Sequence, residues 1–117
     1  MCSIYITLNH AEEDDYTLIE HDSFTNWLDN LKDKSSRLRI VAHLRRMTKG
    51  NFGNHRGLGD GLSELKLDFG PGYRVYFGQE GDKVILLVLG GDKSTQSRDI
   101  NRAKKLLKEW KEERSRQ

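Results

Sequence analysis

The sequence predicts an α+β fold: a small antiparallel sheet that carries an N-terminal helical hairpin and a C-terminal helix. Residues 62–77 alternate between apolar and polar side chains, which is the period of strands with one buried face. Three other segments repeat apolar residues every three or four positions, as amphipathic helices do. With 117 residues, 35% of them apolar and 32% charged, the chain suits one domain, which we place at residues 16–117 after an extension, residues 1–15.

A three-stranded meander forms the centre of the predicted sheet, with an N-terminal strand beside it. Residues 65–69 and 73–77 place apolar side chains at every second position, and the turn Gly70-Pro71-Gly72 lies between them. Residues 84–89 are apolar on both faces, so we expect a central strand that is covered on both sides. The C-terminal helix is the simplest cover for the second face.

The polar positions of the meander form a candidate site. In the simplest hairpin register, Lys66 lies opposite Tyr76 and Asp68 lies opposite Arg74. Glu64, Lys66, Arg74 and Tyr76 then share one outward face. Alternating charges are also typical of a solvated sheet face with cross-strand ion pairs, and the pattern alone favours that interpretation.

The first strand and the helical hairpin precede the meander. Residues 16–20 are the expected strand, and Asp22-Ser23 and Ser35-Ser36 are the expected caps of the two helices. Each helix has an apolar stripe that must pack on the sheet to be stable. The stripes contain Phe24, Trp27, Leu28 and Leu31 in the first helix, and Ile40, Leu44 and Met47 in the second.

A glycine-rich segment and a long helix complete the chain. Residues 50–61 contain five glycines and predict a loop next to the sheet. His55 and Arg56 lie in this loop, near one end of the outward face, although a loop histidine is more often a plain surface residue. Residues 96–113 have an apolar stripe and a basic face, and they predict the last helix.

Basic residues gather in two parts of the chain, although the net charge is only +2. One cluster lies in residues 32–56 and includes Arg45 and Lys49; the other lies in the C-terminal helix and includes Arg98. Such clusters favour a polyanionic partner, with nucleic acid as the default. Either cluster alone is also what a solvated helix face looks like.

The composition disfavours several classes of protein. Cys2 is the single cysteine, so no internal disulfide is possible, and no Cys or His spacing resembles a zinc site. We therefore expect neither a metal nor a cofactor. No stretch approaches the roughly 18–20 apolar residues of a membrane span, and no signal-peptide pattern is present, so the expected location is the cytoplasm.

The segment from Tyr16 to Trp110 resembles the RelE/ParE superfamily of toxins from type II toxin-antitoxin systems. The likeness is greatest to the HigB-like, phage-related branch of addiction module killer proteins. The matching residues occur in the same order over some 75 positions and are Phe24-x-x-Trp27-Leu28, Gly50-Asn51-x-Gly53, Ser63-Glu64-Leu65, Gly70-Pro71-Gly72-Tyr73-Arg74-Val75-Tyr76 and Gly90-Gly91-Asp92-Lys93-Ser94-x-Gln96-x-x-Asp99-Ile100.

This resemblance implies a small toxin that is held inactive by a cognate helix-turn-helix antitoxin of the HigA-like kind, in a hetero-oligomeric complex. In the RelE and HigB branches the activity is cleavage of messenger RNA on the ribosome, which stops translation. In the ParE branch the target is DNA gyrase. A gyrase poison, or an inactive relative that acts only as a binding module, is therefore the alternative to an endoribonuclease.

The resemblance also implies which residues act. Lys66 and Arg74 match two basic positions of the RNA-cleaving members, and Lys93 falls close to a third. Ile100 stands where RelE has a tyrosine, so Tyr76 or His55 would have to replace that stacking role. The remaining RNA-binding candidates are Arg56, Arg45, Lys49 and Arg98.

Metal-free RNA cleavage makes its own chemical demands on these residues. A proton must leave a 2′-hydroxyl, a phosphorane must be stabilised, and the departing 5′-oxygen must be protonated. The guanidinium of Arg74 suits the phosphorane because it can bind two oxygens at once. Lys66 and Glu64 can share the proton transfers, but a lysine acts as a base only if its pKa is lowered, so Glu64 or His55 competes for that role.

Overall fold

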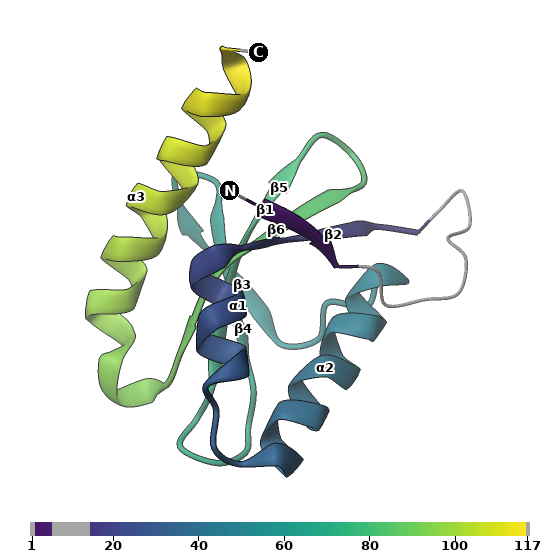
Figure 1. The fold of residues 1–117 in the computed structure, drawn as a ribbon, viewed down its shortest axis with the longest axis vertical. Coiled ribbons are helices and arrows are strands. Elements are labelled where there is room, and N and C mark those ends of the chain that lie inside the picture. Colours follow the sequence, from purple (N-terminus) through teal and green to yellow (C-terminus); the bar gives the residue numbers. More distant parts are fainter. Residues whose placement is uncertain (1, 6–14, 117) are drawn as a thin grey trace.

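The computed structural model describes residues 2–5 and 15–116, and it confirms the α+β class (Figure 1). The strands are β1 (Cys2–Tyr5), β2 (Thr17–His21), β3 (His55–Gly59), β4 (Leu62–Lys66), β5 (Arg74–Glu80) and β6 (Val84–Gly91). The helices are α1 (Asp22–Asp29), α2 (Lys34–Thr48) and α3 (Gln96–Ser115), and a 3-10 turn, η1 (Lys93–Thr95), leads directly into α3.

Helices cover both faces of the sheet, so the described part of the chain has three layers (Figure 1). The α1–α2 hairpin packs on one face and α3 packs on the other. Strand β6 is apolar on both sides and contributes to both cores, as the sequence predicts. The hairpin core contains Phe24, Leu28, Ile40, Leu44, Met47, Leu65, Val75, Phe77 and Leu87. The α3 core contains Leu62, Tyr76, Leu86, Val88, Ala103, Leu107 and Trp110.

The sheet differs from the expected antiparallel sheet of a meander and one N-terminal strand. It has six strands in the order β1-β2-β6-β5-β4-β3, and it is mixed because β2 pairs with β6 in parallel. Apolar alternation reveals which face of a strand is buried but not the direction in which the strand runs. Parallel neighbours need a crossover connection, and the chain between β2 and β6 includes the α1–α2 hairpin that covers the sheet.

The expectation that residues 50–61 form only a loop is wrong. Their second half is β3, which pairs with β4 through a hairpin whose two central residues are Asp60 and Gly61. Both have positive φ, 56° and 80°, as a type I′ turn requires. The glycines hide the strand in the sequence because they give it no apolar alternation, and β3 lies at the edge of the sheet.

Two consecutive glycines end β6 because a helix packs closely on each of its faces. A Cβ on Gly90 would overlap the ring of Trp27 from α1, and a Cβ on Gly91 would overlap the carboxylate of Asp99 from α3. The strand expected at residues 84–89 is longer in the structure, because β6 continues through Gly91. The glycine pair therefore serves close packing of the two helical layers.

The helix caps lie slightly earlier than expected. Nδ1 of His21 accepts a hydrogen bond from the Ser23 amide at 3.0 Å and caps α1. Asp33 caps α2 in the same way through the Ser35 amide. None of the helices that the structure describes is long and apolar enough to cross a membrane.

Candidate functional site

The strand register brings Lys66 and Arg74 directly opposite each other. The pairs are Lys66 with Arg74 and Glu64 with Tyr76, a shift of two residues from the simplest register. A shift of two leaves every side chain on its expected face. The adjoining strand β3 adds Arg56 opposite Glu64, so the candidate residues of three strands share the face that α3 covers in part.

The Glu64 carboxylate lies at the centre of this group and is almost fully buried, with 2% of the residue exposed. Its Oε1 accepts a hydrogen bond from Nε of Arg56 at 3.0 Å. Its Oε2 accepts one from Nε2 of Gln96 at 2.7 Å and lies 3.8 Å from Nε of Arg74. Both oxygens of Glu64 are therefore engaged by side chains from β3, β5 and α3.

Arg74 is buried, contrary to the expectation of an exposed outward residue. Only 5% of it is accessible. One terminal nitrogen, Nη1, donates to the carbonyl oxygens of Gly72 and Tyr73 at 3.0 and 3.4 Å. The guanidinium is thus fixed between the Gly70-Pro71-Gly72 turn and Glu64.

A polar cleft of about 410 Å³ opens above these side chains. Half of the Lys66 side chain is exposed there, and its ammonium lies 4.0 Å from the Asp68 carboxylate. The described lining combines three cationic side chains with a single carboxylate, so it suits an anion. The lining residues are Asn54, His55, Arg56, Glu64, Lys66, Arg74 and Gln96.

His55 borders the cleft with its ring turned toward the hairpin face. The ring packs against Phe52 and Phe77, with centroids 5.6 and 6.4 Å away. Its Nδ1 lies 3.0 Å from the Gly53 carbonyl oxygen. A carbonyl can only accept, so Nδ1 carries the proton in this contact, and the lone pair of a neutral ring would lie on Nε2.

Tyr76 does not belong to the accessible surface, and the expectation that it contributes to an outward patch is wrong. It is fully buried beneath α3. Burial raises the pKa of its hydroxyl, and the nearby Glu64 raises it further. Tyr76 lies directly opposite Leu89 of β6, where the helix covers the sheet.

The other basic candidates are distributed over the molecule. Lys93 lies beside Arg74. The Cβ of Lys93 and the Nη1 of Arg74 both lie within 3.5 Å of the place where a Cβ on Gly72 would be. Arg45 is exposed on α2, on the opposite side of the sheet. Lys49 forms an ion pair with Asp15 at 3.1 Å, and Arg98 lines a separate cleft between α1 and the start of α3.

Gln96 is the member of the cluster that residue-by-residue reasoning missed. It is the first residue of α3, and η1 aims it back toward the sheet. A signal was present, because Gln96 belongs to the segment that carries the family resemblance. The side chain of Gln96 is an uncharged amide, which does not by itself indicate a catalytic role. Its contact with Glu64 arises from the fold.

Comparisons with known proteins identify a relative, but they do not identify a function. No family model matches the chain, and no solved structure matches it. An uncharacterized protein of Haemophilus influenzae is 42% identical over 87 residues, which cover 74% of this chain and 88% of that protein. The chain belongs to the same family as this Haemophilus influenzae protein.

Proposed function

We propose that the chain is the toxin of a type II toxin-antitoxin system and cleaves messenger RNA on the ribosome without a metal ion. The observation that carries the proposal is the direct cross-strand pairing of Lys66 with Arg74 in a polar cleft. The α+β architecture also supports the proposal, because a helical hairpin precedes strands β3 to β6 and α3 follows them.

The cleft residues fit the steps of RNA transesterification. The 2′-oxygen of a nucleotide attacks the phosphorus on the 3′-oxygen of the same ribose. The bond from that phosphorus to the 5′-oxygen of the next nucleotide breaks, and the products are a 2′,3′-cyclic phosphate and a 5′-hydroxyl. Arg74 is assigned to the charge of the phosphorane because its guanidinium is held in place before RNA binds. Lys66 is assigned to protonate the leaving 5′-oxygen, since a lysine ammonium carries a proton at neutral pH.

The general base is assigned to His55 rather than to Glu64. Both oxygens of Glu64 are engaged by donors, so proton uptake would break existing hydrogen bonds. The imidazole of His55 is exposed at the edge of the cleft, and with Nδ1 bonded to the Gly53 carbonyl its Nε2 is the nitrogen that could accept a proton.

A cognate antitoxin and a cytoplasmic site of action belong to the same proposal. A chain that cleaves messenger RNA harms the cell unless a partner occupies or occludes its cleft. We expect a helix-turn-helix antitoxin encoded by the adjacent gene to bind the chain and restore growth when the two are expressed together. Co-purification of that gene product with the chain is the measurement.

Expression of the chain without its antitoxin tests the activity. The proposal predicts growth arrest, rapid loss of protein synthesis, and new 5′ ends inside the coding regions of translated messages. Arrest with intact messages, filamentation and a DNA-damage response would instead identify gyrase as the target.

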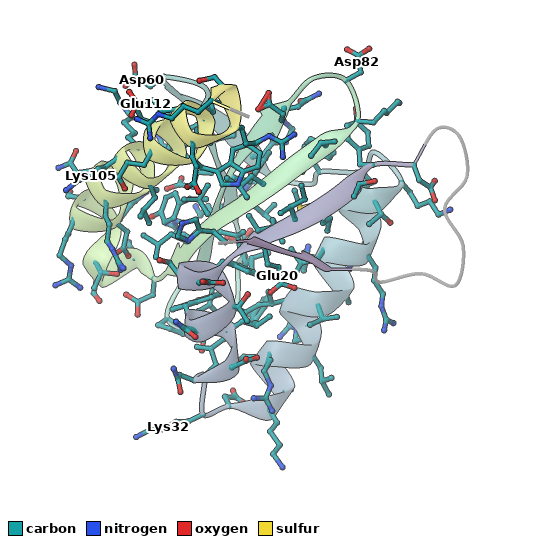
Figure 2. The ribbon with its side chains drawn as sticks, turned by 45° about the horizontal axis from the view of Figure 1, so that its top comes forward. Glu20, Lys32, Asp60, Asp82, Lys105 and Glu112 are labelled. Atoms are coloured by element: carbon teal, nitrogen blue, oxygen red, sulfur yellow. The ribbon has the colours of Figure 1, made fainter. Side chains whose placement is uncertain are left out.

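Two lysine variants provide a matched comparison for that experiment. Lys66→Gln removes a half-exposed cleft ammonium and is expected to abolish arrest. Lys32→Gln removes an exposed ammonium at the connector between α1 and α2, far from α3, and is expected to leave arrest unchanged (Figure 2). Equal toxicity of the two variants would contradict the assignment of the cleft.

A further inference from the structure

We propose that Glu64 and Gln96 are positioning residues that hold Arg56 and Arg74 in register for two neighbouring phosphate oxygens. The inference rests on the proposed function for its substrate, but the arrangement that it describes exists without RNA. Its basis is a single buried carboxylate that accepts hydrogen bonds from Arg56 of β3 and Gln96 of α3 and forms an ion pair with Arg74 of β5.

The carboxylate solves an electrostatic problem in the cleft. Arg56 and Arg74 approach the same small volume from β3 and β5, and two guanidinium groups repel each other. Glu64 lies between them and attracts both, with Nε of Arg56 on one oxygen and Nε of Arg74 nearest to the other. The three side chains together still carry a net positive charge, so the cleft keeps its attraction for phosphate.

The amide of Gln96 fixes the rotation of that carboxylate. Its Nε2 donates to Oε2 of Glu64 at 2.7 Å, and this is the atom that faces Arg74. A lysine or arginine at position 96 would place a third cation beside Glu64 and would compete with Arg56 and Arg74 for its carboxylate. A neutral amide orients the carboxylate without that competition, and it links the start of α3 to the sheet.

The bonds of Arg74 show what this orientation achieves. Its Nη1 donates to the Gly72 and Tyr73 carbonyl oxygens. Its Nε is buried, makes no hydrogen bond and lies 3.8 Å from Oε2 of Glu64. None of the described residues accepts a hydrogen bond from Nη2. The guanidinium plane is therefore set by the turn carbonyls on one side and the Glu64 carboxylate on the other, and Nη2 remains for an incoming phosphate oxygen.

The first test follows the arginine side chains without RNA, by hydrogen exchange at the Nε–H groups of Arg56 and Arg74 in ¹⁵N-labelled protein. Gln96→Ala is expected to speed exchange at Arg56 by about tenfold, the equivalent of one lost hydrogen bond. Gln79→Ala is the matched control, because it removes an exposed glutamine that bonds only to backbone carbonyls of the β5–β6 turn. Unchanged exchange in Gln96→Ala would overturn the inference whether or not the chain cleaves RNA.

The second test separates positioning from binding in the reaction itself. Gln96→Ala and Glu64→Gln are expected to lower kcat for ribosome-bound message by about 10- to 100-fold, because a misplaced guanidinium loses its geometry in the transition state. Gln96→Glu is expected to lose as much, since it sets two carboxylates against each other. A kcat within about twofold of wild type in both Gln96 variants would overturn the positioning role and leave the proposed function intact. Absence of cleavage by the wild-type chain would refute the proposed function, and the exchange measurement would then decide the positioning role.

Discussion

Arg74 lies where the sheet, the glycine turn and the start of α3 meet. Its guanidinium contacts the Glu64 carboxylate on one side and the turn carbonyls on the other, and 7% of its side chain is exposed. Lys66, its cross-strand partner, is half exposed and forms a single long ion pair with Asp68. The two cations therefore share a face but differ in their importance for folding.

Replacement of Arg74 by alanine is expected to cost stability as well as activity. Removing one partner of a buried ion pair leaves a carboxylate less well paired, although Arg56 and Gln96 still bond to Glu64. We expect a loss of about 2–3 kcal/mol in the free energy of unfolding, measured by urea denaturation, against less than about 1 kcal/mol for Lys66→Ala. Equal stabilities of the two variants would show that Arg74 has no structural role.

His21 makes stability depend on pH through the cap of α1. Its Nδ1 must be unprotonated to accept the Ser23 amide, and burial lowers the pKa of His21 below its usual 6.5. The unfolded chain therefore takes up this proton first as the pH falls. The stabilisation is complete above about pH 6.5 and is lost as the pH falls from there through the lowered pKa of the folded state.

The variant His21→Asn isolates this effect, because asparagine accepts the same cap hydrogen bond without titrating. Between about pH 7.5 and pH 5.5, the wild type is expected to lose about 0.5–1 kcal/mol more stability than the variant. Urea denaturation at both pH values measures the difference. His43, whose pKa is also lowered by burial and by Arg46 and Arg39, is present in both proteins and cancels. Parallel pH profiles would rule out the cap as the source.

At the scale of the elements, both helical layers approach the sheet closely at the end of β6. Trp27 of α1 lies over Gly90, and Asp99 of α3 lies over Gly91 and accepts a hydrogen bond from Thr95 at 2.5 Å. The two glycines allow contacts that any side chain would block. This packing also places η1, and with it Gln96, beside the cleft.

Gly90→Ala is expected to destabilise the fold by about 1–3 kcal/mol, because the added methyl group overlaps the Trp27 ring. Gly57→Ala in β3 is the matched control, since a Cβ there meets no atom within 4 Å and the φ angle is not positive. In a Trp27→Leu background the cost of Gly90→Ala is expected to shrink, because the smaller side chain relieves the overlap. Additive effects of the two substitutions in thermal denaturation would contradict this packing.

The sequence predicts those elements whose side chains alternate with a clear period, and it fails where the period is missing. Apolar stripes locate α1, α2 and α3. The alternation of apolar and polar side chains in residues 65–69 and 73–77 predicts that Lys66 and Arg74 lie on one face. The glycines of β3 conceal a strand, although Asp60-Gly61 is a recognisable hairpin turn. The burial of Arg74 and Tyr76 and the contact of Gln96 with Glu64 depend on where α3 packs, which local pattern does not reveal.

At the scale of the whole molecule, one end of the sheet combines a rigid core with an accessible charged cleft. The hairpin packs on one face of the sheet, while on the other face α3 covers Tyr76 but leaves Lys66 and Arg56 half exposed or more. Arginines that are held in place before RNA binds need little reorganisation during reaction. We therefore expect catalysis in this cleft, and we expect the layers around it to supply stability.

The most direct test is the chemistry of the RNA ends after reaction of the purified chain with ribosomes that carry a defined message. The account predicts cleavage at the codon in the decoding site, with a 2′,3′-cyclic phosphate on the upstream fragment and a 5′-hydroxyl on the downstream fragment. Lys32→Gln is expected to cleave like the wild type, and Lys66→Gln is expected not to cleave. An intact message with the wild-type chain, or equal cleavage by the two variants, would contradict the central claim.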